Sequence, residues 1–507
     1  MTKFLLASEA GGISFLVLFA VMTIAVFAVA VWLICLGLKG DVKFKLKPKY
    51  IFFIVLAVGA ALRMLVAFSM RGLVGMSSAN TVTRTGYNGL FNMTYDLIYN
   101  GFTDFWAKYE GAFYYPITMY ILAFFGSICS LFSPLSISSE ATLIFIKLPF
   151  IISDILLALA VYKIAEKFAG EIVALAIGGF VAICPVFMLS SIWPSAYTFF
   201  ALALVIMLYL MLERKYIHFT IVYSISLLIC FEAIFLLPAV AVFLIYAYVK
   251  RVAAYRQEQH KQPLWQSEYG LIVKLPVAII ICLVCSYLLT LPFALGSVGA
   301  NPFAMLYALY LKPFDNFEYF TYNGLSLYNV FVKNGIKLNL SFPTYVFSLL
   351  FAVAVIIVTL IIYLTKKNRA NLAMFISYLL LTINVYFVNT SELTLLPFIA
   401  ATLIAFVILK DKRLLQIAGL ISLLVFINAT GVLIKAEYFA VNATYVSEVL
   451  NNSWLALSIT VSVITIICHL YYTAVLLDIV MNGRIKKLAT NDNKFISSIK
   501  GLIKIKD

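Results

Sequence analysis

Charged side chains that interrupt long apolar stretches are the first candidates for chemistry. Lys147 and Asp154 lie seven residues apart in one such stretch, and a helix would place both on one face. Arg63 lies inside another apolar stretch, and Glu232 stands between two more. Ionisable groups inside a membrane are costly and mark functional sites by default. Lys147, Asp154 and Arg63 are therefore candidate substrate-binding residues, with Lys147 and Arg63 as phosphate ligands. The alternatives are a structural ion pair or interhelical bond for Lys147 and Asp154, and an Arg63 side chain that snorkels outward.

A second set of candidates lies in the aromatic and polar segment at residues 69–113. Its acids are Asp96, Asp104 and Glu110, and its main base is Arg84. A carboxylate in this segment, or Glu232, could accept the proton of an attacking hydroxyl as a general base. The alternatives are a solvated loop charge for the first three acids and a helix cap for Glu232.

Several other chemistries are disfavoured by the residues present. The three histidines, His218, His260 and His469, have no partner at a metal-ligand spacing. Cys282 and Cys285 form a CxxC spacing, but it lies in a helical pattern without a second ligand pair, so we interpret both as packing residues. The sequence contains no P-loop, no GxSxG and no paired-histidine motif, and a nucleotide-driven transporter is therefore disfavoured.

The elements that must position these residues are membrane-spanning helices. The chain has 507 residues, of which 64% are hydrophobic and only 12% charged, whereas soluble domains are about one quarter charged. We predict an all-α polytopic membrane protein of about 13–14 spans, each of roughly 20 residues. The predicted spans lie at about 13–38, 50–68, 114–133, 142–165, 169–190, 193–212, 217–231, 234–250, 271–292, 344–365, 371–388, 393–409, 412–432 and 454–480.

Basic clusters between the spans predict their orientation. The net charge of +15 does not indicate nucleic-acid binding, because the basic residues form short clusters in the connections, as expected of cytoplasmic loops. From Lys163 onward, two spans separate each cluster from the next, so all of them, with the tail from Arg484, can be cytoplasmic. Three apolar segments separate Lys49 from Lys163, so one must be re-entrant or interfacial, unless a cluster misleads. We interpret Asp478 as a solvated helix-end charge.

Two long connections, 69–113 and 293–343, are predicted to share the non-cytoplasmic face, where they could roof a site. Within the first, Phe91 to Tyr109 mixes aromatic and polar residues, which is typical of a helix in the headgroup plane. We predict one transmembrane domain at 1–480 and a basic cytoplasmic tail at 481–507.

Six short stretches follow one another in a familiar order. They are Lys147-Leu148-Pro149 with Asp154 to Lys163, Cys184-Pro185 with Trp193, Leu291 to Gly296, Thr321 to Tyr328, Glu392 to Pro397, and Asp411 to Leu415. Together, over about 50–450, they resemble the GT-C glycosyltransferases, in particular the bacterial mannosyltransferase-like group related to the GPI and N-glycan assembly enzymes. The resemblance implies sugar transfer from a polyprenyl-phosphate donor on the outer side of the membrane. It suggests substrate-binding roles for Trp193, Asn323 and Glu392.

The departures from the family pattern remove most of its charged groups. Trp193 to Tyr197 lacks the acid of the family's Trp-Gly-Gln-x-Asp, and Cys230 to Glu232 lacks the lysine of Lys-Pro-Gln. Ser391 to Thr394 lacks the histidine and arginine of His-Glu-Arg-Tyr, and Ser78 to Tyr87 contains no acid where the family has one. The four candidate bases therefore match no family position. The departing phosphate also needs a cation, for which a divalent metal ion is a candidate cofactor.

Three functions stay open on this reasoning. The first is a GT-C-type glycosyltransferase of the cell membrane that acts on a polyprenyl-phosphate-linked sugar at the outer face, with a cell-surface or lipid-linked acceptor. The second, favoured by the missing acids, is a catalytically inactive relative that serves a partner membrane enzyme as an accessory subunit. The third is a lipid or solute transporter, which ranks last because we find no convincing internal repeat.

Overall fold

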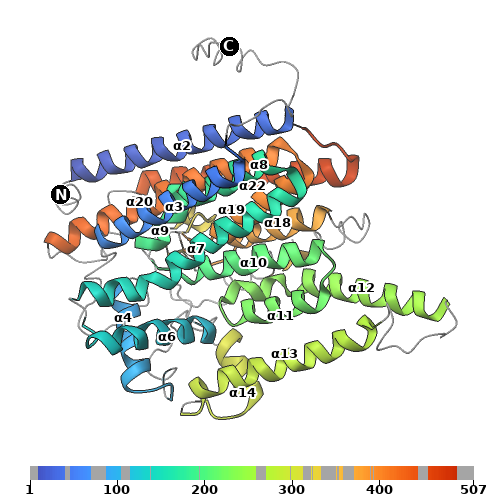
Figure 1. Cartoon of the computed structure of the whole chain (residues 1–507), viewed down its shortest axis with the longest axis horizontal. Coiled ribbons are helices and arrows are strands. Elements are labelled where there is room, and N and C mark those ends of the chain that lie inside the picture. The colour runs from blue at the N-terminus through green and yellow to red at the C-terminus, as the bar shows by residue number, and fades with distance from the viewer. Residues whose placement is uncertain are drawn as a thin grey trace, which may run out of the picture.

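The structure is a computed structural model, and it is a helical bundle throughout the part of the chain that it describes (Figure 1). The described residues are 9–39, 46–69, 87–103, 105, 115–136, 139–192, 194–257, 270–296, 298–311, 321–322, 324–332, 350, 353–354, 356–357, 370–388, 390–391, 393–442 and 455–487. Besides helices, they contain two short strands, β1 (Thr321–Tyr322) and β2 (Thr390–Ser391), which pair in parallel.

Within the described ranges, eight helical segments are long and apolar enough to cross a membrane. This chain is therefore a polytopic membrane protein. The long segments are α2 (Glu9–Lys39), α3 (Pro48–Ser69), α7 (Glu140–Ala169), α8 (Glu171–Ile183) with α9 (Pro185–Ile192), η1 (Phe231–Leu236) with α12 (Leu237–Gln257), α13 (Leu271–Ala294), α20 (Lys412–Asn442) and α22 (Leu455–Asn482).

Five shorter apolar helices complete the bundle within the described residues. They are α6 (Pro116–Phe132), α10 (Ala196–Leu212), α11 (Tyr216–Leu227), α18 (Ala370–Tyr386) and α19 (Leu396–Leu409). The connections contain α4 (Tyr87–Tyr99), α14 (Pro302–Leu306), the π-helical turn η2 (Tyr307–Leu311) and α16 (Tyr328–Phe331). The predicted span at 344–365 lies mostly outside the described residues.

Helices α7, α8, α10 and α19 form the centre of the bundle, where α8 and α19 are buried almost all round. In Figure 1, α2 lies along one edge of the molecule, and α12 and α13 lie toward the opposite edge. Close packing at the centre depends on Gly178 of α8. A Cβ atom there would lie 2.7 Å from the Cβ of Tyr162 and 2.9 Å from the ring of Phe52. Those two rings stack on each other at 4.0 Å between centroids, so glycine lets α8 approach α3 and α7.

Helices α3 and α7 are antiparallel, which defines the two ends of the bundle. Phe52 stacks on Tyr162, Arg63 pairs with Asp154, and Lys147 reaches the carbonyl oxygen of Ala67. At the end where α3 begins and α7 ends, Lys167 forms an ion pair with Glu213 at 2.7 Å, so the α10–α11 connection lies there too. We call this the basic end, since Lys49, Lys163, Lys167, Arg214 and Lys215 gather at it. The opposite end is the loop end.

Helix α6 begins and ends at the loop end. The amide of Ile117 in its first turn donates to Leu228 O just after α11, and Phe132 at its end stacks on Phe145 near the start of α7. These contacts place both ends of α6 near the loop end. They favour the alternative in which 114–133 is the non-crossing one of the three apolar segments between Lys49 and Lys163, and that assignment stays a prediction.

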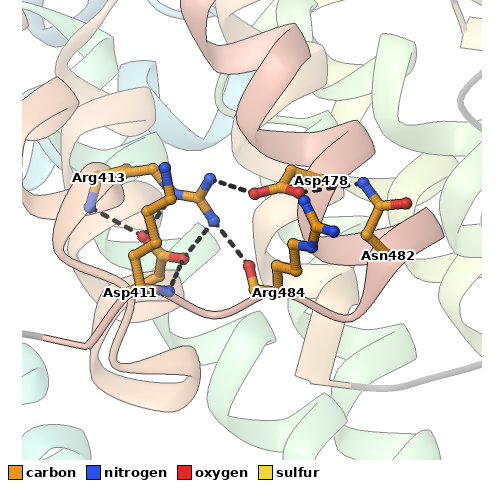
Figure 2. Close-up of polar contacts among 6 residues, drawn as sticks. Asp411, Arg413, Asp478, Asn482 and Arg484 are labelled. Carbon is orange, nitrogen blue, oxygen red and sulfur yellow. Dashed lines mark hydrogen bonds and ion pairs between the residues drawn. The ribbon is translucent and has the colours of Figure 1, made fainter.

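A cluster of ion pairs and hydrogen bonds joins the start of α20 to the end of α22 at the basic end (Figure 2). Arg413 donates to both carboxylate oxygens of Asp411 and, at 2.6 Å, to Asp478, and its Nη2 also reaches Arg484 O. The backbone amide of Lys486 also donates a hydrogen bond to Asp411 Oδ2. Asp478 lies near the end of α22 and is partly exposed, as the sequence suggested, but it also forms an ion pair with Arg413, which the sequence did not indicate.

Candidate functional site

Glu232 lies at the loop end in the first turn of η1 and is partly exposed. The Tyr197 hydroxyl in the first turn of α10 donates to Glu232 Oε1 at 2.6 Å, and the Cys230 thiol donates to Oε2. Burial, followed by the charge of Glu232, raises the pKa of Cys230 well above its usual value. The thiol therefore stays protonated at neutral pH, as its donor role requires. Glu232 is a carboxylate held on both oxygens by neutral donors.

A second layer of tyrosines surrounds this carboxylate. Tyr115, the residue before α6, donates to Leu309 O at 2.8 Å, and Tyr310 of η2 donates to Leu227 O at 2.9 Å. Burial, then the neighbouring Tyr310 and Glu232, raises the pKa of Tyr115 well above its usual value. Its hydroxyl is therefore uncharged over the physiological range. These bonds hold the start of α6, the end of α11 and the connection after α13 together near Glu232.

The strand pair brings the connection after α13 to the same place. Thr321 pairs with Thr390 and Tyr322 with Ser391. A Cβ atom at Gly324 would lie 2.1 Å from Thr390 Oγ1 and 2.5 Å from its carbonyl oxygen, so only glycine fits there. Phe387, a few residues before Ser391, packs on Phe235 of η1 at 5.0 Å between ring centroids. The stretches around Tyr197 and Glu232 therefore meet each other and lie near the one around Ser391, and the pairing adds 321–322 to them.

A separate polar cluster lies deeper in the bundle. Arg63 and Asp154 are each 1% exposed, and Arg63 Nε lies 3.5 Å from Asp154 Oδ2, which also accepts from Ser190. Other donors of Arg63 go to backbone carbonyls, among them Ala182 O. Within the described residues Asp154 Oδ1 has no hydrogen-bond partner. Four of the five guanidinium N–H donors that a phosphate would need are already engaged, so a structural role fits this pair better.

Lys147 lies on α7, seven residues before Asp154, and is fully buried. Its Nζ lies 3.4 Å from Ala67 O near the end of α3. The predicted pairing of Lys147 with Asp154 is not among the contacts of the structure, because Asp154 turns to Arg63. Asp96 lies on α4, is largely buried, and accepts from Asn100 at 2.7 Å. Its role as a base and that of Lys147 as a phosphate ligand stay predictions.

Six of the predicted site residues lie outside the described residues: Arg84, Asp104, Glu110, Trp193, Asn323 and Glu392. The sequence reasoning did not single out Tyr197, Cys230, Tyr115 and Ser391 as site residues. One signal pointed to Tyr197, because it occupies the place of the missing family acid. The others carry no charge and stand in apolar surroundings, so nothing in the sequence separates them from packing residues.

Among the residues that the structure describes, no three His, Cys, Asp or Glu side chains gather as a metal site would require. A divalent cation at the loop end therefore has no ligand set in this part of the chain. Comparison with known proteins adds no family: no protein-family model and no curated protein matches the sequence. The geometry alone thus supports a carboxylate site at the loop end, presented by Glu232.

Proposed function

We propose that this protein is a GT-C-type membrane glycosyltransferase. It would move a sugar from a polyprenyl-phosphate donor to a cell-surface or lipid-linked acceptor at the non-cytoplasmic face. The observation that carries the proposal is Glu232, a partly exposed carboxylate held by Tyr197 and Cys230 where the motif-like stretches converge. A positioned carboxylate is the group that transfer to a hydroxyl needs as its base.

In the proposed reaction, the acceptor oxygen attacks the anomeric carbon of the donor. The bond between that carbon and the phosphate oxygen breaks, the electron pair leaves with the polyprenyl phosphate, and the hydroxyl proton passes to Glu232. The leaving phosphate needs a cation. Because Arg63 is engaged by Asp154 and by backbone carbonyls, we assign that task to Arg84 or to a divalent cation.

The proposed orientation of the protein in the membrane rests on the positions of its lysines and arginines. Lysines and arginines from α3, α7, the α10–α11 turn and the segment after α22 occupy the basic end, and such residues are retained on the cytoplasmic side. We therefore place the basic end and the tail that follows it in the cytoplasm. The loop end with Glu232 then faces the outside, where a sugar carried on a polyprenyl phosphate would be presented.

The test is transfer by the purified protein in lipid nanodiscs supplied with polyprenyl-phosphate sugars. Glu232→Gln keeps the shape but not the base, and general bases contribute about 10²–10⁴ in rate, so turnover should fall by about that factor. Glu166→Gln, an acid at the basic end that pairs with Lys163, is the matched control and should keep its rate. An active Glu232→Gln variant, or wild-type protein inactive with every donor, would contradict the proposal.

A second candidate is the non-catalytic accessory subunit. It is favoured by the fact that both carboxylate oxygens of Glu232 already accept hydrogen bonds from the protein's own side chains. In that case the protein should co-purify with a second membrane enzyme whose activity depends on it. Glu232→Gln should then leave the activity of the complex unchanged.

A further inference from the structure

The last ten residues of α12 lie beyond the packed bundle. Ala247 is the last buried side chain of this helix, and none of residues 248–257 is buried. In Figure 1 this end of α12 projects past the ends of α10 and α11 at the basic end. The projecting part carries Lys250, Arg251 and Arg256, and α12 contains no acid. A helix end with three cations and no acid is therefore left outside the bundle.

An aromatic contact fixes α12 beside the α10–α11 turn. The ring of Phe243 lies 5.5 Å from the ring of Tyr216, centroid to centroid, and Tyr216 is the first residue of α11. Lys250 follows Phe243 by seven residues, or two helical turns, so it lies on the same face of α12. That face looks toward the turn, where Arg214 and Lys215 directly precede Tyr216. We call this group of cations the basic corner; its members are Arg214, Lys215, Lys250 and Arg251.

The four cations of the basic corner have no counter-charge among the described residues. Elsewhere at the basic end, Lys163 pairs with Glu166 at 2.8 Å and Lys167 with Glu213 at 2.7 Å. The acid next to the turn is thus already engaged, and no ion pair joins an acid of the described chain to a member of the corner. Like charges that gather in this way repel one another, and an anion between them relieves the repulsion.

The backbone of Arg214 is a second sign that its charge has a role. Its φ of 59° is left-handed, and it occupies the position after a helix at which glycine is preferred. The amide of Arg214 donates to Met211 O at 3.2 Å, and that of Lys215 to Leu210 O at 2.9 Å, which is the Schellman motif. Glycine would close this motif without the steric cost that a Cβ atom brings. An arginine is therefore not what the turn itself requires.

We propose that the basic corner binds the headgroup of an anionic phospholipid in the leaflet at the basic end. The side chains of Ile245 and Val249 are 61% and 56% exposed, so apolar surface open to lipid reaches to the residue before Lys250. The corner therefore lies at the level where acyl chains give way to headgroup phosphates, which selects a lipid over a soluble anion. Arg256, further along α12, adds a cation at the same membrane surface. The proposal is independent of sugar transfer.

The test is binding of dioleoyl phosphatidylglycerol to the purified protein in neutral detergent, measured by native mass spectrometry, with phosphatidylcholine as the neutral lipid. One cation near an anionic lipid surface contributes about 5-fold in affinity. Arg214→Gly should therefore bind phosphatidylglycerol about 5-fold more weakly, and the double variant Lys250→Gln with Arg251→Gln about 25-fold more weakly. Binding of phosphatidylcholine should be weaker than that of phosphatidylglycerol and unchanged by these variants.

The matched control is Lys410→Gly. Lys410 also has a left-handed φ, of 57°, and lies between α19 and α20 at the basic end, but it is outside the basic corner. Its replacement should change the affinity by less than about 2-fold. Both glycine variants should keep or raise the melting temperature in neutral detergent, because glycine adopts the left-handed conformation without steric cost. A weaker lipid affinity of Arg214→Gly is then not a folding defect.

Three results would overturn the proposal. Equal weakening by Arg214→Gly and Lys410→Gly would mean that lipids are attracted by the basic end as a whole and not by the corner. Equal affinity for phosphatidylcholine would mean that no anion is recognised. Displacement of the lipid by glycerol 3-phosphate at the same concentration would mean that the ligand is a soluble anion.

Discussion

Two carboxylates of this protein have opposite surroundings, and these explain their different assignments. Asp154 is sealed in the bundle beside the guanidinium of Arg63. Glu232 is partly open and is met by the neutral hydroxyl and thiol of Tyr197 and Cys230. The charge of a buried acid with a cation beside it is neutralised within the protein. An open acid with neutral donors keeps its charge available to a ligand.

The pairing of Arg63 and Asp154 makes a prediction about stability. Removing one partner leaves an uncompensated buried charge, so Asp154→Leu should lower the free energy of unfolding by about 3–5 kcal/mol. The double variant Arg63→Met with Asp154→Leu should recover much of that loss. Thermal unfolding in detergent, followed by tryptophan fluorescence, measures both.

The control for this prediction is an exposed pair on the same helix. Lys163 and Glu166 are 52% and 28% exposed, and such pairs contribute about 0–1 kcal/mol. Lys163→Ala should therefore leave the melting temperature nearly unchanged. Equal effects of Asp154→Leu and Lys163→Ala would contradict the structural role of the buried pair.

At the scale of elements, α8 supplies a matched pair of glycines. A Cβ at Gly178 would press on Tyr162 and Phe52, at 2.7 and 2.9 Å, whereas one at Gly179 would meet Val55 at an ordinary 3.7 Å. We expect Gly178→Ala to cost about 1–3 kcal/mol by forcing α8 away from α7. Gly179→Ala should be neutral or stabilising by up to about 1 kcal/mol, since alanine is the better helix former. Thermal unfolding of both variants decides this, and similar effects would contradict the packing.

Most helices of the bundle were predictable because long apolar runs have a single stable form in a membrane. The predicted spans at 142–165, 271–292 and 412–432 correspond to α7, α13 and α20, with ends displaced by a few residues or one or more turns. The largest difference is at α20, which continues to Asn442. Apolar composition predicts which residues can lie in lipid but does not mark where a helix stops when it leaves the lipid.

The candidate site was predictable only in part. Glu232 stood out because a lone acid between apolar spans is unusual. Its partners did not, since Tyr197 lies 35 positions away in the sequence and Cys230, two positions away, carries no charge. The sequence also suggested a Lys147–Asp154 pair from helical spacing alone. The structure gives Asp154 to Arg63 instead, because a partner on a neighbouring helix cannot be found from spacing within one helix.

At the scale of the molecule, the geometry of α3, α6 and α7 predicts which connections share a side of the membrane. Cysteines placed at Thr103 and Ser133, on either side of α6, should both react with a membrane-impermeant maleimide on intact cells. Cysteines at Lys49 and Lys163, at the basic end, should react only after permeabilisation. The experiment uses a background without the native cysteines. Labelling of Ser133→Cys only after permeabilisation would mean that α6 crosses.

The basic end also depends on the order in which the chain is made. Arg413 has Asp411 beside it from the moment that α20 leaves the ribosome, whereas Asp478, Arg484 and Lys486 emerge at least 65 positions later. The hairpin of α19 and α20 can therefore enter the membrane with its arginine already neutralised. The remaining bonds, from Arg413 to Asp478 and Arg484 and from Lys486 to Asp411, can form only after α22 has been inserted. A chain that ends before Asp478 would keep the bonds from Arg413 to Asp411 and lose those to Asp478 and Arg484.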